Sequence, residues 1–129
     1  MTTGLIVDDA AIMRIRLREI LEPEYDIVAE AGDGEEALEK YAEFTPDFVT
    51  LDITMPRTNG LDALPRLLER DPSARVIIVS AVGQKRIVIN ALKMGAVDFI
   101  IKPFERDRVL VAVERVVQGR MGDTVREFA

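Results

Sequence analysis

Two residue types that carry much protein chemistry are absent from this sequence of 129 residues, which contains no cysteine and no histidine. The missing cysteines exclude disulfides, thiol catalysis and zinc–thiolate sites. The missing histidines remove the usual general base and the usual transition-metal ligand. Tryptophan is also absent and there are only two tyrosines, so aliphatic side chains must fill the core. Any chemistry must therefore use Asp, Glu, Lys, Ser or Thr.

Long apolar runs and a basic excess are missing as well. No window approaches the roughly 18 apolar residues of a membrane span, and the first residues lack the basic start of a signal peptide. The formal net charge of −6 argues against nucleic acid as the main partner of this domain, because phosphate binding requires a basic face. We expect a cytoplasmic protein with no membrane partner, of a length that suits one domain.

What the sequence does contain is five short apolar runs alternating with five helical patterns. Most of the runs are continuous rather than alternating, which predicts parallel strands covered on both faces. The predicted strands are Leu5–Val7, Ile27–Ala29, Phe48–Leu51, Val76–Val79 and Phe99–Ile101. The predicted helices are Ile12–Leu21, Glu35–Phe44, Leu61–Arg70, Lys85–Met94 and Arg106–Gln118. This order predicts a doubly wound α/β fold with five parallel strands and five helices.

Three boundary signals refine this prediction. Pro65 is tolerated only in the first turn of a helix, so its helix should start no earlier than about Leu61. Gly95 suits a helix C-cap, and Gly32–Gly34 suits a plain turn. We expect one domain over residues 1–119, with residues 120–129 forming a C-terminal tail or the start of a linker.

Polar residues follow four of the five predicted strands. They are Asp8 and Asp9, Asp52, Ser80 and Lys102. Parallel strands end at one edge of the sheet, where open α/β sheets bind their ligands, so these side chains should converge. Clustered carboxylates repel one another and need a cation, and hard oxygen ligands without His or Cys favour Mg²⁺. A metal, a lysine and a hydroxyl around Asp52 predict phosphoryl transfer with Asp52 as the nucleophile.

Each of these residues also has an ordinary interpretation when it is taken alone. The Asp8–Asp9 pair could cap the following helix, and Asp52 could form a turn. Ser80 could be a satisfied strand-end hydroxyl, and Lys102 a solvated surface lysine. Their shared position at strand ends is what favours a functional site.

The same residues resemble the receiver domain of bacterial two-component response regulators, over roughly residues 4–118. The motifs are Val7-Asp8-Asp9, Asp52-Ile53-Thr54-Met55-Pro56 with Asn59-Gly60, Ser80-Ala81 and Lys102-Pro103-Phe104. Within that family the sequence most resembles stand-alone chemotaxis regulators. The resemblance implies a flavodoxin-like sheet with strand order 2-1-3-4-5.

The resemblance also implies a role for each motif residue. Asp52 would accept the phosphoryl group, and Lys102 would pair with it. Mg²⁺ would be bound by Asp9, Asp52 and the backbone carbonyl of Thr54, with Asp8 acting through a water. Ser80 and Phe99 would be the switch residues, and the Lys102–Pro103 peptide bond would be cis, which only an X-Pro bond adopts at low cost.

The function implied is a phosphorylation-controlled signalling switch. A histidine kinase would donate the phosphoryl group, and the domain would catalyse its own phosphorylation and slow dephosphorylation without a metabolite substrate. The output partner, possibly a flagellar motor switch, would bind the face formed by the fourth helix, fifth strand and fifth helix of a monomer. Three consecutive apolar residues, Ile87-Val88-Ile89, cannot all face the core, so at least one should be exposed there.

Three alternatives stay open at this point. The chain could be a receiver domain from a larger regulator, such as a transcription factor or a methylesterase. It could be a Mg²⁺-dependent aspartyl phosphotransferase, although such enzymes carry a second acid where Thr54 stands. It could be a pseudo-receiver that only binds protein, against which the complete set of acids, hydroxyl and lysine argues.

Overall fold

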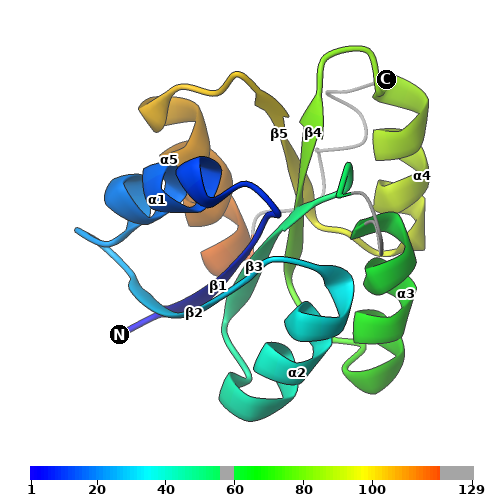
Figure 1. The fold of residues 1–129 in the computed structure, drawn as a ribbon, viewed down its shortest axis with the longest axis horizontal. Helices are drawn as coiled ribbons and strands as arrows, with labels where there is room; N and C mark the ends of the chain where they lie inside the picture. Colours follow the sequence, from blue (N-terminus) through cyan, green and yellow to red (C-terminus); the bar gives the residue numbers. More distant parts are fainter. Residues whose placement is uncertain (56–59, 120–129) are drawn as a thin grey trace.

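Five strands alternate with five helices in the computed structural model, which describes residues 1–55 and 60–119. The strands are β1 (Thr3–Val7), β2 (Asp26–Ala31), β3 (Phe48–Asp52), β4 (Val76–Ala81) and β5 (Asp98–Lys102). The helices are α1 (Ala11–Leu21), α2 (Gly34–Phe44), α3 (Gly60–Arg70), α4 (Lys85–Met94) and α5 (Arg106–Val117). All strand pairs are parallel, in the order β2-β1-β3-β4-β5. This is the predicted doubly wound, flavodoxin-like fold (Figure 1).

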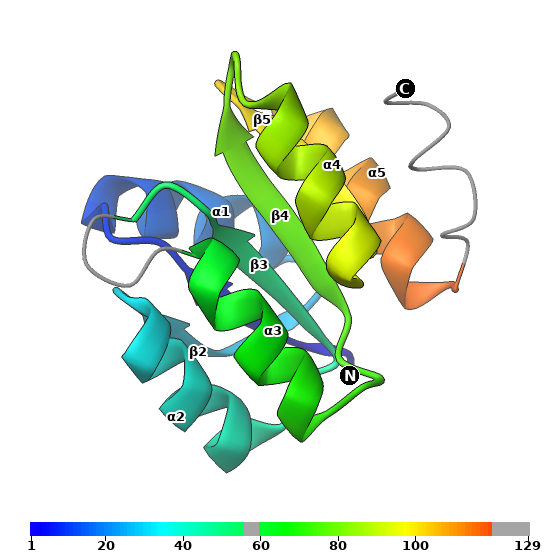
Figure 2. The ribbon, with the colours of Figure 1, turned by 90° about the vertical axis from the view of Figure 1, so that its right-hand side faces the viewer.

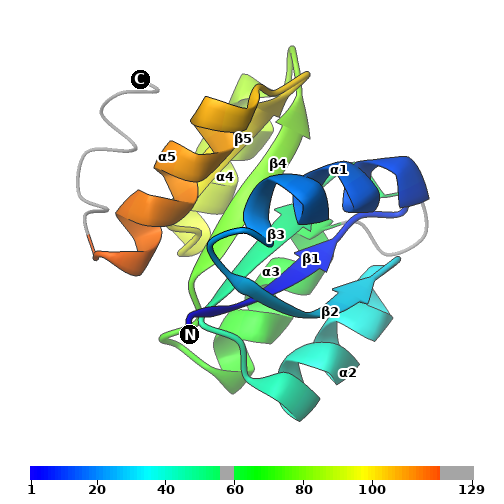
Figure 3. The same ribbon diagram turned by 90° about the vertical axis from the view of Figure 1, so that its left-hand side faces the viewer.

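The helices form two layers around the sheet. Helices α3 and α4 lie in front of the sheet with α2 in Figure 2, and α1 and α5 cover the opposite face in Figure 3. Each layer of helices covers its own hydrophobic core, and the side chains of successive strand residues point alternately into the two cores. Leu5 and Val7 of β1 pack with α2, α3 and α4, whereas Ile6 packs with α1 and α5. Continuous apolar strands are therefore required, because both faces of each central strand are buried.

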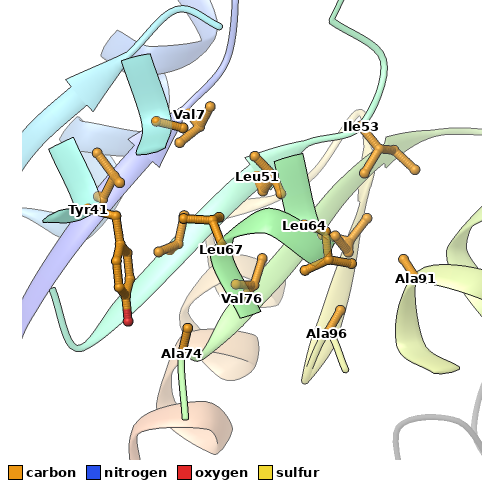
Figure 4. Packing of buried hydrophobic residues seen from close by; sticks show 14 of the residues in the cluster. Val7, Tyr41, Leu51, Ile53, Leu64, Leu67, Ala74, Val76, Ala91 and Ala96 are labelled. Carbon is orange, nitrogen blue, oxygen red and sulfur yellow. The ribbon is translucent and has the colours of Figure 1, made fainter. Parts of the chain in front are cut away.

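The core beneath α2, α3 and α4 is the larger of the two, and it is built from aliphatic side chains (Figure 4). Leu64 and Leu67 of α3 are fully buried against the sheet residues Leu51 and Val76. Tyr41 is the one aromatic residue in this cluster of buried residues, and its hydroxyl donates a 2.7 Å hydrogen bond to Asp71. The scarcity of aromatic residues is thus met by interlocking Leu, Ile and Val side chains.

The predicted helix boundaries agree with the structure to within one residue. Helix α4 has the predicted bounds, and Gly95 follows it as the C-cap with φ = 128°. Helix α1 begins one residue early, and α5 ends at Val117 rather than Gln118. The turn expected at residues 32–34 contains a helix cap, since the Asp33 side chain accepts a 2.8 Å hydrogen bond from the Glu36 N–H. Asp33 thus satisfies a donor at the start of α2.

The expectation about Pro65 was wrong. Helix α3 begins at Gly60, and Pro65 is its sixth residue, in the second turn rather than the first. A proline there cannot donate to the Leu61 carbonyl, so one helical hydrogen bond is lost. The helix persists because Ala63, Leu64 and Leu67 are completely buried, while Pro65 itself is exposed. Tertiary packing outweighs the local propensity.

Some predicted features lie outside the described residues. They are the tail at residues 120–129 and most of the turn that includes Pro56 and Asn59. Within residues 1–55 and 60–119, no helix has the length and apolar character needed to cross a membrane.

Candidate functional site

Four of the five polar residues predicted to converge, Asp8, Asp9, Asp52 and Lys102, do so at the carboxyl ends of the strands. Asp8 follows β1 directly, Asp52 is the last residue of β3, and Lys102 is the last residue of β5. Strands β1 and β3 are neighbours, and the chain leaves them toward opposite edges of the sheet. The two buried acids therefore stand at the strand-order reversal, where open α/β sheets form their binding crevice.

Three carboxylates form one cluster at this point. Oxygens of Asp8, Asp9 and Asp52 all lie within 4.8 Å of one another. Asp8 and Asp52 are almost completely buried, whereas Asp9 is exposed. Taking carboxylates out of water is costly unless they are paired or bind a cation, so the cluster needs positive charge.

Lys102 supplies part of that charge. Its Nζ lies 3.1 Å from Asp8 Oδ2 and 3.3 Å from Asp52 Oδ2. Burial lowers the pKa of Lys102, but the charge of Asp52 and the hydrogen bond to Asp8 outweigh burial and hold the pKa above its ordinary value. The ammonium group is therefore fixed in its charged form between the two acids. Lys102 is not the solvated surface lysine of the ordinary interpretation.

The pKa of Asp8 is also raised, but here burial is the main cause rather than the effect that is outweighed. Burial raises the pKa of its carboxyl group, the hydrogen bond from the Ala10 N–H lowers it, and the neighbouring charge of Asp52 raises it further. The net result is a pKa above the ordinary value, although Lys102 stabilises the charge. One ammonium group does not compensate for three acids. Neither acid is the N-cap residue of α1, which is Ala10, although Asp8 Oδ1 accepts a 2.9 Å hydrogen bond from the Ala10 N–H.

Asp52 is held from two directions. Its Oδ1 accepts hydrogen bonds from the Thr54 N–H at 2.9 Å and from the Thr54 hydroxyl at 2.6 Å, while its Oδ2 faces Lys102. This contact across two residues is the Asx-type turn of the ordinary interpretation. The turn and the site are compatible, since the turn directs the carboxylate toward Lys102.

The two predicted switch residues lie outside the cluster of acids. Ser80 is one residue beyond the β4 partner of Asp52, and Phe99 lies three residues before Lys102 in β5. Ser80, in β4, is fully buried, and its Oγ has no hydrogen-bond partner among the described residues. A buried hydroxyl without a partner is costly, so this side chain can gain free energy from an acceptor placed at the site. Phe99, in β5, is half-buried, and Arg108 of α5 lies 5.4 Å from its ring centre. The Lys102–Pro103 peptide bond is cis.

Sequence reasoning missed two residues that support the acids. Arg14 of α1 donates from Nη1 to the Asp8 carbonyl oxygen at 2.6 Å and from Nε to Glu30 at 3.0 Å. Glu30 was a visible signal, because it is a charged residue between two alanines near the end of β2. Its contact with α1 could not be read from its position in the sequence.

The donor set of the cluster suits a hard divalent cation. All three side chains offer carboxylate oxygens, and they outnumber the ammonium group of Lys102. Burial, and with it the charge of Asp52, raises the pKa of Asp8. A cation bound here would remove that repulsion, and oxygen donors of this kind are those that Mg²⁺ prefers.

A buried acid at the strand-order reversal, with two further acids and a lysine against it, is the arrangement of a response regulator receiver domain. Residues 5–114 match the family model described as the response regulator receiver domain, and the chain belongs to this family of two-component signalling proteins.

Named relatives cover nearly the same length. The chain is 52% identical over 115 residues to the chemotaxis protein CheY of Listeria monocytogenes, covering 88% of this chain and 97% of that protein. It is 53% identical over 118 residues to the protein CcdB of Bacillus subtilis, covering 91% of this chain and 98% of that protein. Among solved structures, CheY in a CheX–CheY–BeF₃–Mg complex from Borrelia burgdorferi gives a TM-score of 0.86 at 42% identity, covering 89% of this chain and 88% of that one.

Proposed function

We propose that this protein is a phosphorylation-controlled signalling switch in which Asp52 accepts a phosphoryl group from a histidine kinase. The observation that carries the proposal is the position of Asp52, a buried acid that ends a central strand within reach of two acids and a lysine. A buried carboxylate with a fixed cation beside it is a nucleophile placed for in-line attack on phosphorus.

The remaining residues stabilise charge around that step. Lys102 neutralises negative charge that develops on the phosphoryl oxygens, and its raised pKa keeps it protonated at neutral pH. Asp8, Asp9 and Asp52, with the backbone carbonyl of Thr54, would hold Mg²⁺. The ion, when bound, supplies Lewis-acid stabilisation of the phosphoryl oxygens. The domain in this proposal catalyses its own phosphorylation and dephosphorylation.

The output face of the proposal is formed by α4, β5 and α5. Val88 is buried, Ile87 is 36% exposed and Ile89 is half-buried, which supports the expectation that an apolar residue of α4 reaches the surface. A hollow of about 690 Å³ lies against β5 and α5, lined by apolar residues that include Phe99 and Val111 and by charged residues that include Glu105 and Arg115. This apolar surface supports binding of a protein partner near the switch residue Phe99.

A role in chemotaxis is the particular output we favour, with a flagellar motor switch as the candidate partner. Its support is the similarity to proteins named CheY, among them the one in the CheX complex. The equally similar protein CcdB carries a different name. The same switch would serve a receiver joined to a larger regulator. The aspartyl phosphotransferase alternative loses support, because Thr54 occupies the place of a second acid and the chain belongs to the receiver family.

The test is phosphorylation by acetyl phosphate with Mg²⁺, followed by mass spectrometry of the intact protein. The parent protein should gain one phosphoryl group, and Asp52→Asn should gain none. Asp47→Asn is the matched control, because Asp47 precedes the same strand at its opposite end and should leave the reaction unchanged. A stoichiometric adduct on Asp52→Asn would overturn the assignment of the nucleophile.

A further inference from the structure

The arginine that contacts the Asp8 main chain is itself held in a fixed place. Arg14 is mostly buried, with 23% of its side chain exposed, and its guanidinium group bridges Asp8 O and Glu30 Oε1. The second oxygen of Glu30 accepts from Arg18 Nε at 2.6 Å. Glu30 therefore anchors Arg14 from β2, and both carboxylate oxygens of Glu30 are used. A side chain restrained in this way can position whatever it contacts.

What Arg14 contacts is the peptide bond between the two acids. The Asp8 N–H donates to the Ala31 carbonyl at 3.0 Å, and the Asp8 carbonyl accepts from Arg14. Because a peptide unit is planar, the direction of the Asp8 carbonyl also fixes where the Asp9 Cα lies. Asp9 is exposed, so surrounding side chains provide little restraint of their own.

We propose that Arg14 is a positioning residue for the Asp8–Asp9 metal site, acting through the Asp8 carbonyl without touching the ion. This inference rests on the proposed function, since it assumes that the carboxylate cluster binds Mg²⁺. Arg14 orients the two acids so that they meet Asp52, and Glu30 orients Arg14. Groups that orient metal ligands typically contribute about 10–100-fold to metal affinity.

The sign of the effect separates positioning from simple electrostatics. Arg14 is a cation close to a proposed cation site, so its charge alone opposes Mg²⁺ binding. Removing the charge should strengthen binding if electrostatics were its only influence. Removing a positioning residue should weaken binding.

The experiment compares three variants by calorimetric titration with MgCl₂, alongside urea unfolding without metal. Arg14→Met should bind Mg²⁺ about tenfold or more weakly than the parent protein. Arg18→Met is the matched control, because it removes the same charge from the same helix and the same Glu30 contact but does not reach Asp8. It should bind as tightly as the parent or more tightly. Arg14→Lys should be intermediate, since one ammonium group cannot form the two-sided bridge.

When urea unfolding shows Arg14→Met to be folded, two results with this variant would overturn the inference. One is unchanged or tighter Mg²⁺ binding by Arg14→Met. The other is an equal loss in Arg14→Met and Arg18→Met. If Arg14→Met does not fold, the comparison of Arg14→Lys with Arg18→Met decides, and equal affinities of these two refute the inference. A parent protein that binds no Mg²⁺ would instead refute the metal site of the proposed function, and the inference with it.

Discussion

At the scale of single residues, the site is defined by charges that the fold buries without fully compensating them. Asp8 and Asp52 are nearly inaccessible, and Lys102 is the cation between them. The raised pKa of Asp8 means that its ionisation costs folding free energy in the absence of a metal. Such a cost is typical of functional sites, where ligand binding rather than folding sets the arrangement of charges.

Because the ionisation of Asp8 costs folding free energy, we predict that the stability of the protein without metal depends on pH. A carboxyl group whose pKa is higher in the folded than in the unfolded state favours folding at low pH, and this contribution is lost as pH rises through the folded-state pKa. In EDTA, the free energy of unfolding of Asp8→Asn should therefore increase relative to that of the parent protein as pH rises above about 4, where carboxyl groups ordinarily ionise. The difference should become constant once Asp8 of the parent protein is fully ionised. Urea unfolding of both proteins from pH 4 to pH 8 measures the difference. A difference that shrinks with rising pH would contradict the assignment.

Ser80 gives a second prediction at this scale. A phosphoryl oxygen at Asp52 would offer its buried hydroxyl a charge-assisted hydrogen bond, which biases a two-state element. Ser80→Ala should still accept phosphate at Asp52 but transmit the change poorly. NMR shifts across residues 85–115, with and without beryllofluoride, should change markedly less than in the parent protein. Ser73→Ala is the control, because Ser73 is an exposed serine before the start of β4, at the end opposite Ser80. A response of Ser80→Ala equal to that of the parent protein disproves the switch.

At the scale of elements, close packing between strands limits which residues are possible. Gly4 of β1 pairs in register with Phe48 of β3, and a Cβ at this glycine would collide with the Phe48 ring. Phe48 cannot yield easily, because it is fully buried and meets the Tyr25 ring edge-to-face at 5.4 Å. The contact joins the two strands that lead to Asp8 and Asp52, at the end of the sheet opposite the site.

This contact predicts the effect of one added methyl group. Gly4→Ala should lower the free energy of unfolding by about 1–3 kcal/mol, the usual cost of overpacking a core. Urea unfolding measures it. Gly32→Ala is the control, because a Cβ there meets no atom closer than 3.7 Å, and it should cost less. Gly119→Ala is unsuitable, because φ = 78° at Gly119 would strain any side chain. Equal losses in the Gly4 and Gly32 variants would show that the ring contact is unimportant.

At the scale of the whole molecule, two layers of helices cover the sheet, and the buried acids at its edge are a cost that the fold carries. A ligand that binds only the folded protein stabilises the whole fold by mass action. The carboxylate cluster is the one group of three or more candidate metal ligands found within residues 1–55 and 60–119. Metal binding at this single place should therefore be visible in global stability.

Mg²⁺ should raise the melting temperature of the whole protein. At tenfold excess over the dissociation constant, the gain is about 1.4 kcal/mol. Asp9→Ala should abolish the rise, and without metal it should be at least as stable as the parent protein because it relieves repulsion. Asp26→Ala, an exposed acid at the start of β2, should keep the rise. The absence of a shift in the parent protein would count against the metal site.

The sequence by itself determined the layered sheet and the convergence of Asp8, Asp9, Asp52 and Lys102. Both follow from local patterns, since continuous apolar runs require two covering layers and parallel strands all end at one edge. Only the tertiary structure decided that α3 accepts Pro65 in its second turn, and that Arg14 links Glu30 to the Asp8 carbonyl. These outcomes depend on side-chain directions and on packing between segments distant in sequence. The periodicity of apolar residues predicts neither the side-chain directions nor this packing, because it specifies which face of an element is buried but not which partner lies against it.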